Sequence, residues 1–175
     1  MTIDKLISFN NISVMIVSNE NIWNDSRFIE LKDRVGEGAV LITLLIHVGT
    51  LLKSGGDKVF DSFGLSTESY EVLFIVRACK ETRPSDLAEY TLMHPAKTTR
   101  VIDSLIDKKY IERVYDKKDR RSYYLILTDS GENILKECDK ANMEVSNVVK
   151  NKFEPDTYNM LINILFAMMK AMKHK

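Results

Sequence analysis

The sequence predicts a mainly α protein with one small β-hairpin. Only 7 glycines and 3 prolines occur in 175 residues, too few for the frequent turns of a many-stranded sandwich. Apolar residues recur at helical spacing along most of the chain, and only residues 110–127 show short strand-like runs. A chain of this length suits one domain with an extension, and such a domain buries enough surface to form a core without disulfides.

Composition excludes several classes of protein. A chain that is 45% hydrophobic and 29% charged is not disordered. Two cysteines, Cys79 and Cys138, cannot form a disulfide framework or a four-cysteine zinc site, and they fit buried thiols in a reducing cytosol. Residues 1–5 lack a basic signal-peptide start, and the most apolar run, 39–52, falls short of a membrane span of ~20 residues. We therefore expect a soluble cytoplasmic protein with no membrane segment, metal or cofactor.

In residues 1–24 the apolar run 12–17 fits either a strand or the start of a helix, and one long helix is predicted next, over 27–53. Phe28, Leu31 and Val35 recur on one side of it, and 40–52 is apolar nearly all round, so we expect burial on most sides. The sequence Lys53-Ser54-Gly55-Gly56 is expected to end this helix, because glycine favours a left-handed cap.

A helix, a turn and a second helix are predicted next, before the hairpin. Ser66 is a candidate N-cap for a helix that contains Tyr70 and Arg77. A short helix follows over 86–90, started by the segment 83–86. A longer helix is predicted over 95–109, with Pro95 at the favoured first helical position. The longer one buries Thr98, Val101, Ile102 and Leu105, and its opposite face carries small and basic residues, namely Ala96, Lys97, Arg100 and Ser104.

The chain is predicted to close with a hairpin and two helices. Strands over 110–115 and 122–127 flank a polar turn, and helices are expected over 128–151 and from Pro155 onward. The last helix has an apolar stripe that we assign to dimerisation: Leu161, Ile162, Leu165, Met169 and Met172. Together with the run 40–52, this helix has more apolar surface than one small lobe can cover.

Charge is uneven along a chain whose net charge is zero. Residues 94–121 hold nine basic and five acidic side chains, so this segment is positive and the remainder is negative. A basic patch in a neutral protein is typical of polyanion binding, although a solvated charged surface gives the same pattern.

The order of a helix-turn-helix and a basic hairpin resembles the winged helix of the MarR family of bacterial transcription regulators. The resemblance is strongest over 85–131 and includes the pair Thr99-Arg100. The wing signature consists of an Asp-x-Arg, a Leu-x-Leu-Thr strand end and a glycine, present as Asp119, Arg121, Leu125, Leu127, Thr128 and Gly131. Leu92 and Lys109 stand where the family usually has glycine, and Lys109 is expected in a left-handed conformation.

This resemblance implies a division of the chain and a mode of DNA binding. It implies an N-terminal extension (1–24), a dimerisation helix (25–64), a winged helix-turn-helix (65–131) and C-terminal dimerisation helices (132–175). The helix over 95–109 would enter the major groove and the wing an adjacent minor groove. The implied DNA-binding residues are Ala96, Lys97, Thr99, Arg100, Ser104, Lys117, Lys118, Asp119, Arg120 and Arg121.

The resemblance also implies a ligand-responsive homodimer, in the role of a repressor on a pseudo-palindromic operator. A small aromatic or lipophilic effector is implied between the dimer helices and the DNA-binding lobe. Candidate contacts are His47, Tyr70 and Arg77, although a lone histidine on an apolar face is more often a core residue. Cys79 and Cys138 do not match the position of the family's peroxide-sensing cysteine.

Two other functions are less consistent with the sequence. A winged helix that binds another protein would not need the basic wing, although retention on DNA has to decide this. An enzyme is not expected, since no nucleophile-histidine pattern, phosphate-binding loop or metal cluster is present in the sequence. The operator, the effector and the direction of regulation cannot be read from the sequence.

Overall fold

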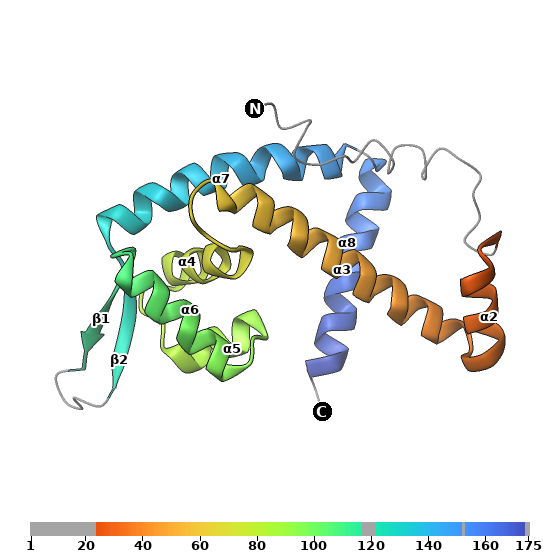
Figure 1. Cartoon of the computed structure of the whole chain (residues 1–175), viewed down its shortest axis with the longest axis horizontal. Helices are drawn as coiled ribbons and strands as arrows, with labels where there is room; N and C mark the ends of the chain where they lie inside the picture. The colour runs from red at the N-terminus through yellow and green to blue at the C-terminus, as the bar shows by residue number, and fades with distance from the viewer. Residues whose placement is uncertain (1–23, 117–121, 152, 174–175) are drawn as a thin grey trace.

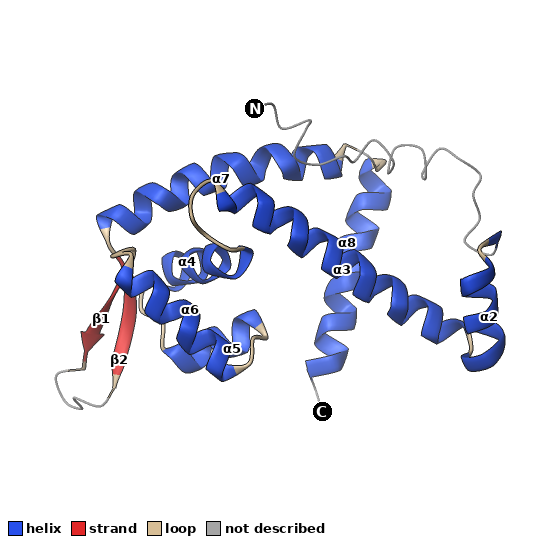
Figure 2. Ribbon diagram, viewed as in Figure 1, coloured by secondary structure: helices blue, strands red, loops and turns tan. Residues whose placement is uncertain are grey.

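The computed structural model describes residues 24–116, 122–151 and 153–173 (Figure 1). Within these ranges the protein is helical apart from one two-stranded antiparallel sheet (Figure 2). The elements in chain order are α2 (Ser26–Val35), α3 (Glu37–Asp61), α4 (Thr67–Cys79), α5 (Pro84–Thr91), α6 (Pro95–Asp107), β1 (Ile111–Tyr115), β2 (Tyr123–Leu127), α7 (Asp129–Lys150) and α8 (Pro155–Lys173). The predicted mainly α fold with a small hairpin is confirmed.

The single helix expected over 27–53 is two helices. Gly36 separates α2 from α3 with a φ of 103°, a conformation that side chains rarely adopt. The backbone N–H of Gly36 still donates to the Lys32 carbonyl, so the chain turns directly at the end of α2. Periodicity alone missed this break because apolar residues continue at helical spacing on both sides of it.

The glycine pair at 55–56 does not end α3, which continues to Asp61. A Cβ on Gly56 would lie 2.6 Å from Oγ1 of Thr67, at the first residue of α4. The absence of a side chain at 56 therefore lets the two helices approach closely. The expected termination is wrong because this glycine serves packing and not the helix end.

Because α3 continues to Asp61, it is longer than the apolar run 39–52 and has to be compared again with the length of a membrane span. At 25 residues, with a mean hydropathy of 1.5 over its most apolar window, α3 is long and apolar enough to cross a membrane by length and composition alone. The shorter run 39–52 did not meet this length. One such helix is weak support for a membrane location, because the helices of soluble proteins pass the same test.

The main core lies in a lobe formed by α4, α5, α6, the hairpin and the first half of α7. Its fully buried side chains come from each of these elements and include Leu73, Leu87, Ile102, Leu105, Ile111, Leu125 and Leu135. The strands pair in register from Ile111 opposite Leu127 to Tyr115 opposite Tyr123. Thr82, in the segment between α4 and α5, adds a bridge to Leu125 and ties the hairpin to the lobe.

Helices α3 and α8 lie largely outside this lobe, as Figure 1 shows. The run 40–52 was expected to be buried on most sides, but within one chain only Val40 of this run is buried. Large apolar side chains of α3 remain exposed: Leu41, Ile42, Ile46, Val48, Leu51 and Leu52. The expectation is wrong for one chain because the helix extends away from the lobe, beyond the reach of its core residues.

Candidate nucleic-acid interface and an adjoining cavity

Helix α6 presents one buried and one exposed face. Pro95 occupies its first turn, and the side chain of His94 caps it by accepting from the Ala96 N–H at 3.2 Å. Thr98, Ile102 and Leu105 are buried against the lobe. The predicted contact residues on this helix are all exposed: Ala96, Lys97, Thr99, Arg100 and Ser104. The fold therefore gathers them on the solvent side of one helix.

Lys97 differs from the other predicted DNA contacts on α6 because it is already ion-paired. Its Nζ lies 2.6 Å from Oε1 of Glu68 on α4, and Lys53 on α3 lies 3.3 Å from the same oxygen. Burial by itself would raise the pKa of Glu68, but hydrogen bonds from Lys97 and Lys53 hold that pKa below its usual value. The pairing connects three helices, and a phosphate that engages Lys97 has to compete with Glu68.

Arg100 is the exposed cation of α6 that remains available. Among the described residues, the Arg100 side chain makes no hydrogen bond or ion pair. A structural role for Arg100 in stabilising the fold therefore has no support. Further along the helix, Asp103 accepts from Arg113 of β1 at 2.6 Å. The Arg113 guanidinium also lies 5.2 Å from the ring centroid of Tyr123. The second half of α6 therefore holds the hairpin in place.

The predicted wing tip falls outside the described residues. Lys117, Lys118, Asp119, Arg120 and Arg121 all belong to it, so their roles in DNA binding stay predictions. A contact beside the wing was missed by sequence reasoning. Arg83, just before α5, donates to the Tyr124 hydroxyl at 3.1 Å, and its guanidinium lies 5.1 Å from that ring's centroid. Only the fold brings these two positions together.

The left-handed residue expected at the end of α6 is present. Lys109 has a φ of 60°, and Leu92, in the turn before α6, has a φ of 56°. The Thr128 hydroxyl donates to the Lys109 carbonyl at 2.6 Å and accepts from the Gly131 N–H at 3.0 Å. A Cβ on Gly131 would overlap with the carbonyl oxygen of Tyr110. Thr128 and Gly131 thus fix the start of α7 against the end of α6.

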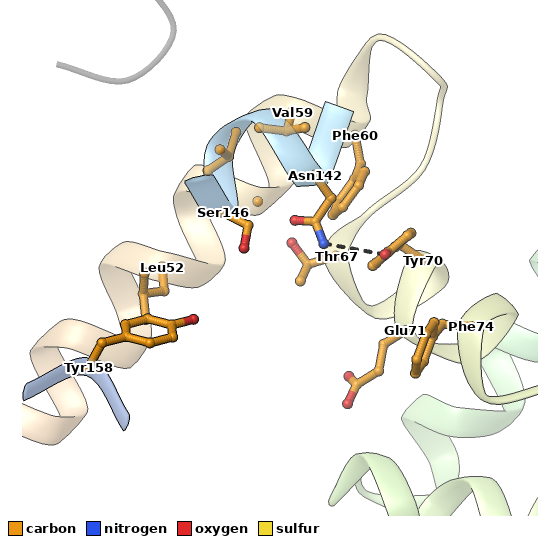
Figure 3. A pocket seen from close by; sticks show the side chains of 12 residues that line it. Leu52, Val59, Phe60, Thr67, Tyr70, Glu71, Phe74, Asn142, Ser146 and Tyr158 are labelled. Carbon is orange, nitrogen blue, oxygen red and sulfur yellow. Dashed lines mark hydrogen bonds between the residues drawn. The ribbon is translucent and has the colours of Figure 1, made fainter. Parts of the chain in front are cut away.

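A cavity of about 510 Å³ adjoins the lobe, between α3, α4, α7 and the start of α8. Figure 3 shows side chains from these four helices around it. They are Leu52, Gly56, Val59, Phe60, Thr67, Tyr70, Glu71, Phe74, Asn142, Val145, Ser146 and Tyr158. The volume is in the range of small-molecule sites.

A polar cluster joins α4 to α7 at one end of this cavity. The Tyr70 hydroxyl donates to Asp139 at 2.9 Å and accepts from the Asn142 amide at 3.3 Å (Figure 3 shows the second bond). Arg77 also donates to Asp139, at 2.7 Å. Burial, and next the Asp139 hydrogen bond, raise the pKa of Tyr70. The hydroxyl therefore stays protonated, and its one proton is engaged in the hydrogen bond to Asp139.

The structure separates the three predicted effector contacts. Tyr70 lines the cavity. Arg77 pairs with Asp139, His47 is exposed on α3, and neither Arg77 nor His47 lines the cavity. Sequence reasoning missed Glu71 and Asn142. The spacing of Asn142, four residues after the buried Cys138, places an amide next to an apolar stripe, and this was the available signal.

The two cysteines differ in exposure. Cys138 is buried in the core, and burial raises the pKa of its thiol to about 11. Because the thiolate is the reactive form, Cys138 is poorly suited to sensing oxidants. Cys79 is exposed at the end of α4, so the expectation of a buried thiol is wrong for this residue.

Glu71 is a partly buried carboxyl group in the cavity wall. Burial, and next the negative charge of Glu68, raise its pKa above 4.5. A raised pKa means that the folded state is disfavoured as pH rises through that value, since the ionised form is the costly one. We expect Glu71→Gln to have a higher melting temperature than the wild type at pH 7. Calorimetric melting down to about pH 4 should show this advantage shrinking as Glu71 becomes protonated. A lower melting temperature for the variant at pH 7 would contradict this account.

Comparison with known proteins yields one family and several relatives. Residues 65–123 match the sequence model described as the MarR family. The HTH-type transcriptional regulator BilQ of Clostridioides difficile is 26% identical over 109 residues, covering 62% of this chain and 74% of BilQ. Among solved structures, a cysteine-to-serine mutant of Escherichia coli MarR complexed with operator DNA aligns with a TM-score of 0.69 at 18% identity, covering 79% of this chain and 96% of that chain. A DNA complex of Staphylococcus aureus MepR gives 0.68 at 18% identity, covering 74% and 96%. At these identities the structural likeness shows the fold.

Proposed function

We propose that this chain, whose residues 65–123 match the MarR family model, is a winged helix-turn-helix regulator of that family: a dimeric repressor that binds specific double-stranded DNA and responds to a small ligand. The observation that carries the proposal is the exposed outer face of α6, where Arg100 stands unpaired among the described residues beside small side chains. Arginine is the usual bidentate reader of guanine in the major groove. In this proposal the protein acts in the cytoplasm, on the nucleoid.

The homodimer is supported by the apolar faces that one chain leaves uncovered. On α8 the predicted dimerisation residues Leu161, Ile162, Leu165, Met169 and Met172 are all exposed, as are six large apolar side chains of α3. Uncovered apolar faces of this size are typical of protein interfaces, and obligate interfaces resemble a core cut in half. A two-fold dimer presents two α6 helices to half-sites about 34 Å apart, which requires a pseudo-palindromic operator.

The response to ligand is supported by the place of the cavity. Its wall contains parts of α3 and α8, which belong to the proposed dimer interface, and of α4, which packs on α6. A ligand that favours one arrangement of these helices changes the separation of the two α6 helices and with it the affinity for DNA. Tyr70, which lines the cavity, is the predicted effector contact that this proposal retains.

The direct test is protection mapping on the DNA around the gene for this protein, followed by titration of the protected site. Arg100→Ala should weaken operator binding by ~10- to 100-fold, the loss expected for one good base contact of about 1–3 kcal/mol. Lys140→Ala removes the same charge from an exposed position on α7 and is the matched control. Equal affinity for Arg100→Ala and the control would refute the assignment of α6. No retention on any DNA would instead favour a protein-binding winged helix.

A further inference from the structure

The side chains that line the cavity indicate which class of ligand it can bind, which its position alone does not. Among its described lining residues, four are aromatic and the one formally charged side chain is that of Glu71. Lysine, arginine and histidine are absent from this lining. The aromatic members come from three helices and are Phe60, Tyr70, Phe74 and Tyr158. An acid is therefore the sole charge in a mostly apolar wall.

Glu71 has no counter-charge in the described part of the chain, where no hydrogen bond or ion pair to its carboxylate is found. Its neighbour Glu68 adds negative charge. Figure 3 shows its side chain next to Phe74, on the same helix. A carboxylate in such surroundings gains most from a positive group that reaches it without water.

Three cations on the helices around Glu71, namely Lys53, Lys97 and Arg77, are engaged in other ion pairs. Lys53 lies 2.6 Å from Asp57 and 3.3 Å from Glu68, which in turn holds Lys97. Arg77 lies 2.7 Å from Asp139, and its guanidinium is 5.7 Å from the ring centroid of Phe74. None of these cations lines the cavity. Within the described residues of one chain, the cavity lining thus offers Glu71 no positive side chain, and a cationic ligand would supply that charge.

The aromatic rings suit the same kind of ligand. Phe60 and Tyr70 stack with centroids 4.4 Å apart and planes 16° from parallel, which fixes both rings in the wall. Ring faces attract cations and also contact the apolar part of a ligand. An anion, by contrast, would meet an acid and no basic side chain in this lining.

We propose that the cavity binds a lipophilic organic cation, with the Glu71 carboxylate as its counter-charge and the aromatic rings as the contact surface for its apolar groups. The proposal rests on the proposed function, in which this cavity is the effector site. It differs from the general expectation of a small aromatic or lipophilic ligand because it fixes the sign of the charge.

Two probes of the same shape and opposite charge test this sign: tetraphenylphosphonium and tetraphenylborate. Titration calorimetry of the full chain without DNA should show tetraphenylphosphonium binding, and Glu71→Gln should weaken it at least tenfold. Glu144→Gln removes the same charge from an exposed position of α7 that does not line the cavity, and it should bind as the wild type does. Tetraphenylborate binding should not weaken in Glu71→Gln.

Three results would overturn the proposal: no binding of the cation, binding that Glu71→Gln leaves unchanged, or an equal loss in Glu144→Gln. The proposed function is tested separately, by adding tetraphenylphosphonium to the operator complex. Glu71-dependent binding of the cation without release of DNA would leave this inference standing and refute the ligand response. DNA binding by a chain that does not bind the cation would refute this inference alone.

Discussion

Leu165→Asp is expected to abolish dimerisation and operator binding together. Leu165 is 42% exposed in one chain, in the middle of the apolar stripe of α8. In the proposed dimer a carboxylate there would be buried without a partner, at a cost of several kcal/mol. A monomer contacts one half-site, and the affinity of that single contact is too small to hold the operator. Sedimentation at micromolar concentration and operator titration measure the two losses.

The control for Leu165→Asp lies on the same helix. Asn163→Asp adds the same charge at an exposed polar position on the opposite side of α8 from the stripe. It should stay dimeric and bind the operator. A Leu165→Asp protein that remains dimeric and binds DNA would refute the role of α8, and so would a wild type that sediments as a monomer.

Gly131→Ala should be among the most destabilising single substitutions in the DNA-binding lobe. The added methyl group would overlap with the Tyr110 carbonyl oxygen, and Leu127 is also close. The Tyr110 carbonyl is held in place because it accepts from the Thr128 N–H at 3.1 Å. Neither backbone segment can move without breaking the hydrogen bond between Thr128 and Tyr110. We therefore expect the free energy of unfolding to fall by about 3 kcal/mol, or the protein not to fold. Denaturant unfolding followed by circular dichroism measures it.

Gly55→Ala provides the matched comparison. Gly55 lies within α3 with nothing near the position of an added Cβ. Alanine is favoured over glycine inside a helix by roughly 0.5–1 kcal/mol, so this variant should be slightly more stable than the wild type. If Gly131→Ala were as stable as Gly55→Ala, the close contact between Gly131 and Tyr110 would not be important for the stability of the lobe.

Sequence alone predicted the elements of the DNA-binding lobe because each depends on neighbours within a few residues. The two faces of α6 follow from apolar residues three and four apart, and Pro95 marks its start. The hairpin follows from two short branched and aromatic runs around a polar turn. The left-handed Lys109 was expected from a position where the resembling family has glycine. Local periodicity carries the information on the helices and strands, so no knowledge of distant contacts was needed for them.

Tertiary structure decided what depends on residues far apart in the chain. The close packing of Gly56 on Thr67 carries α3 past the glycine pair, and the exposure of α3 depends on where the lobe lies. The Lys97–Glu68 pair spans 29 positions, and the cavity combines Leu52 and Glu71 with Asn142 and Tyr158. Glu71 looks like any helical surface acid in the sequence, and its burial beside aromatic rings comes only from the packing of four helices. Helical spacing says which face of a helix is apolar, whereas the partner of that face, and the charge left in the space between, follow from how the helices pack.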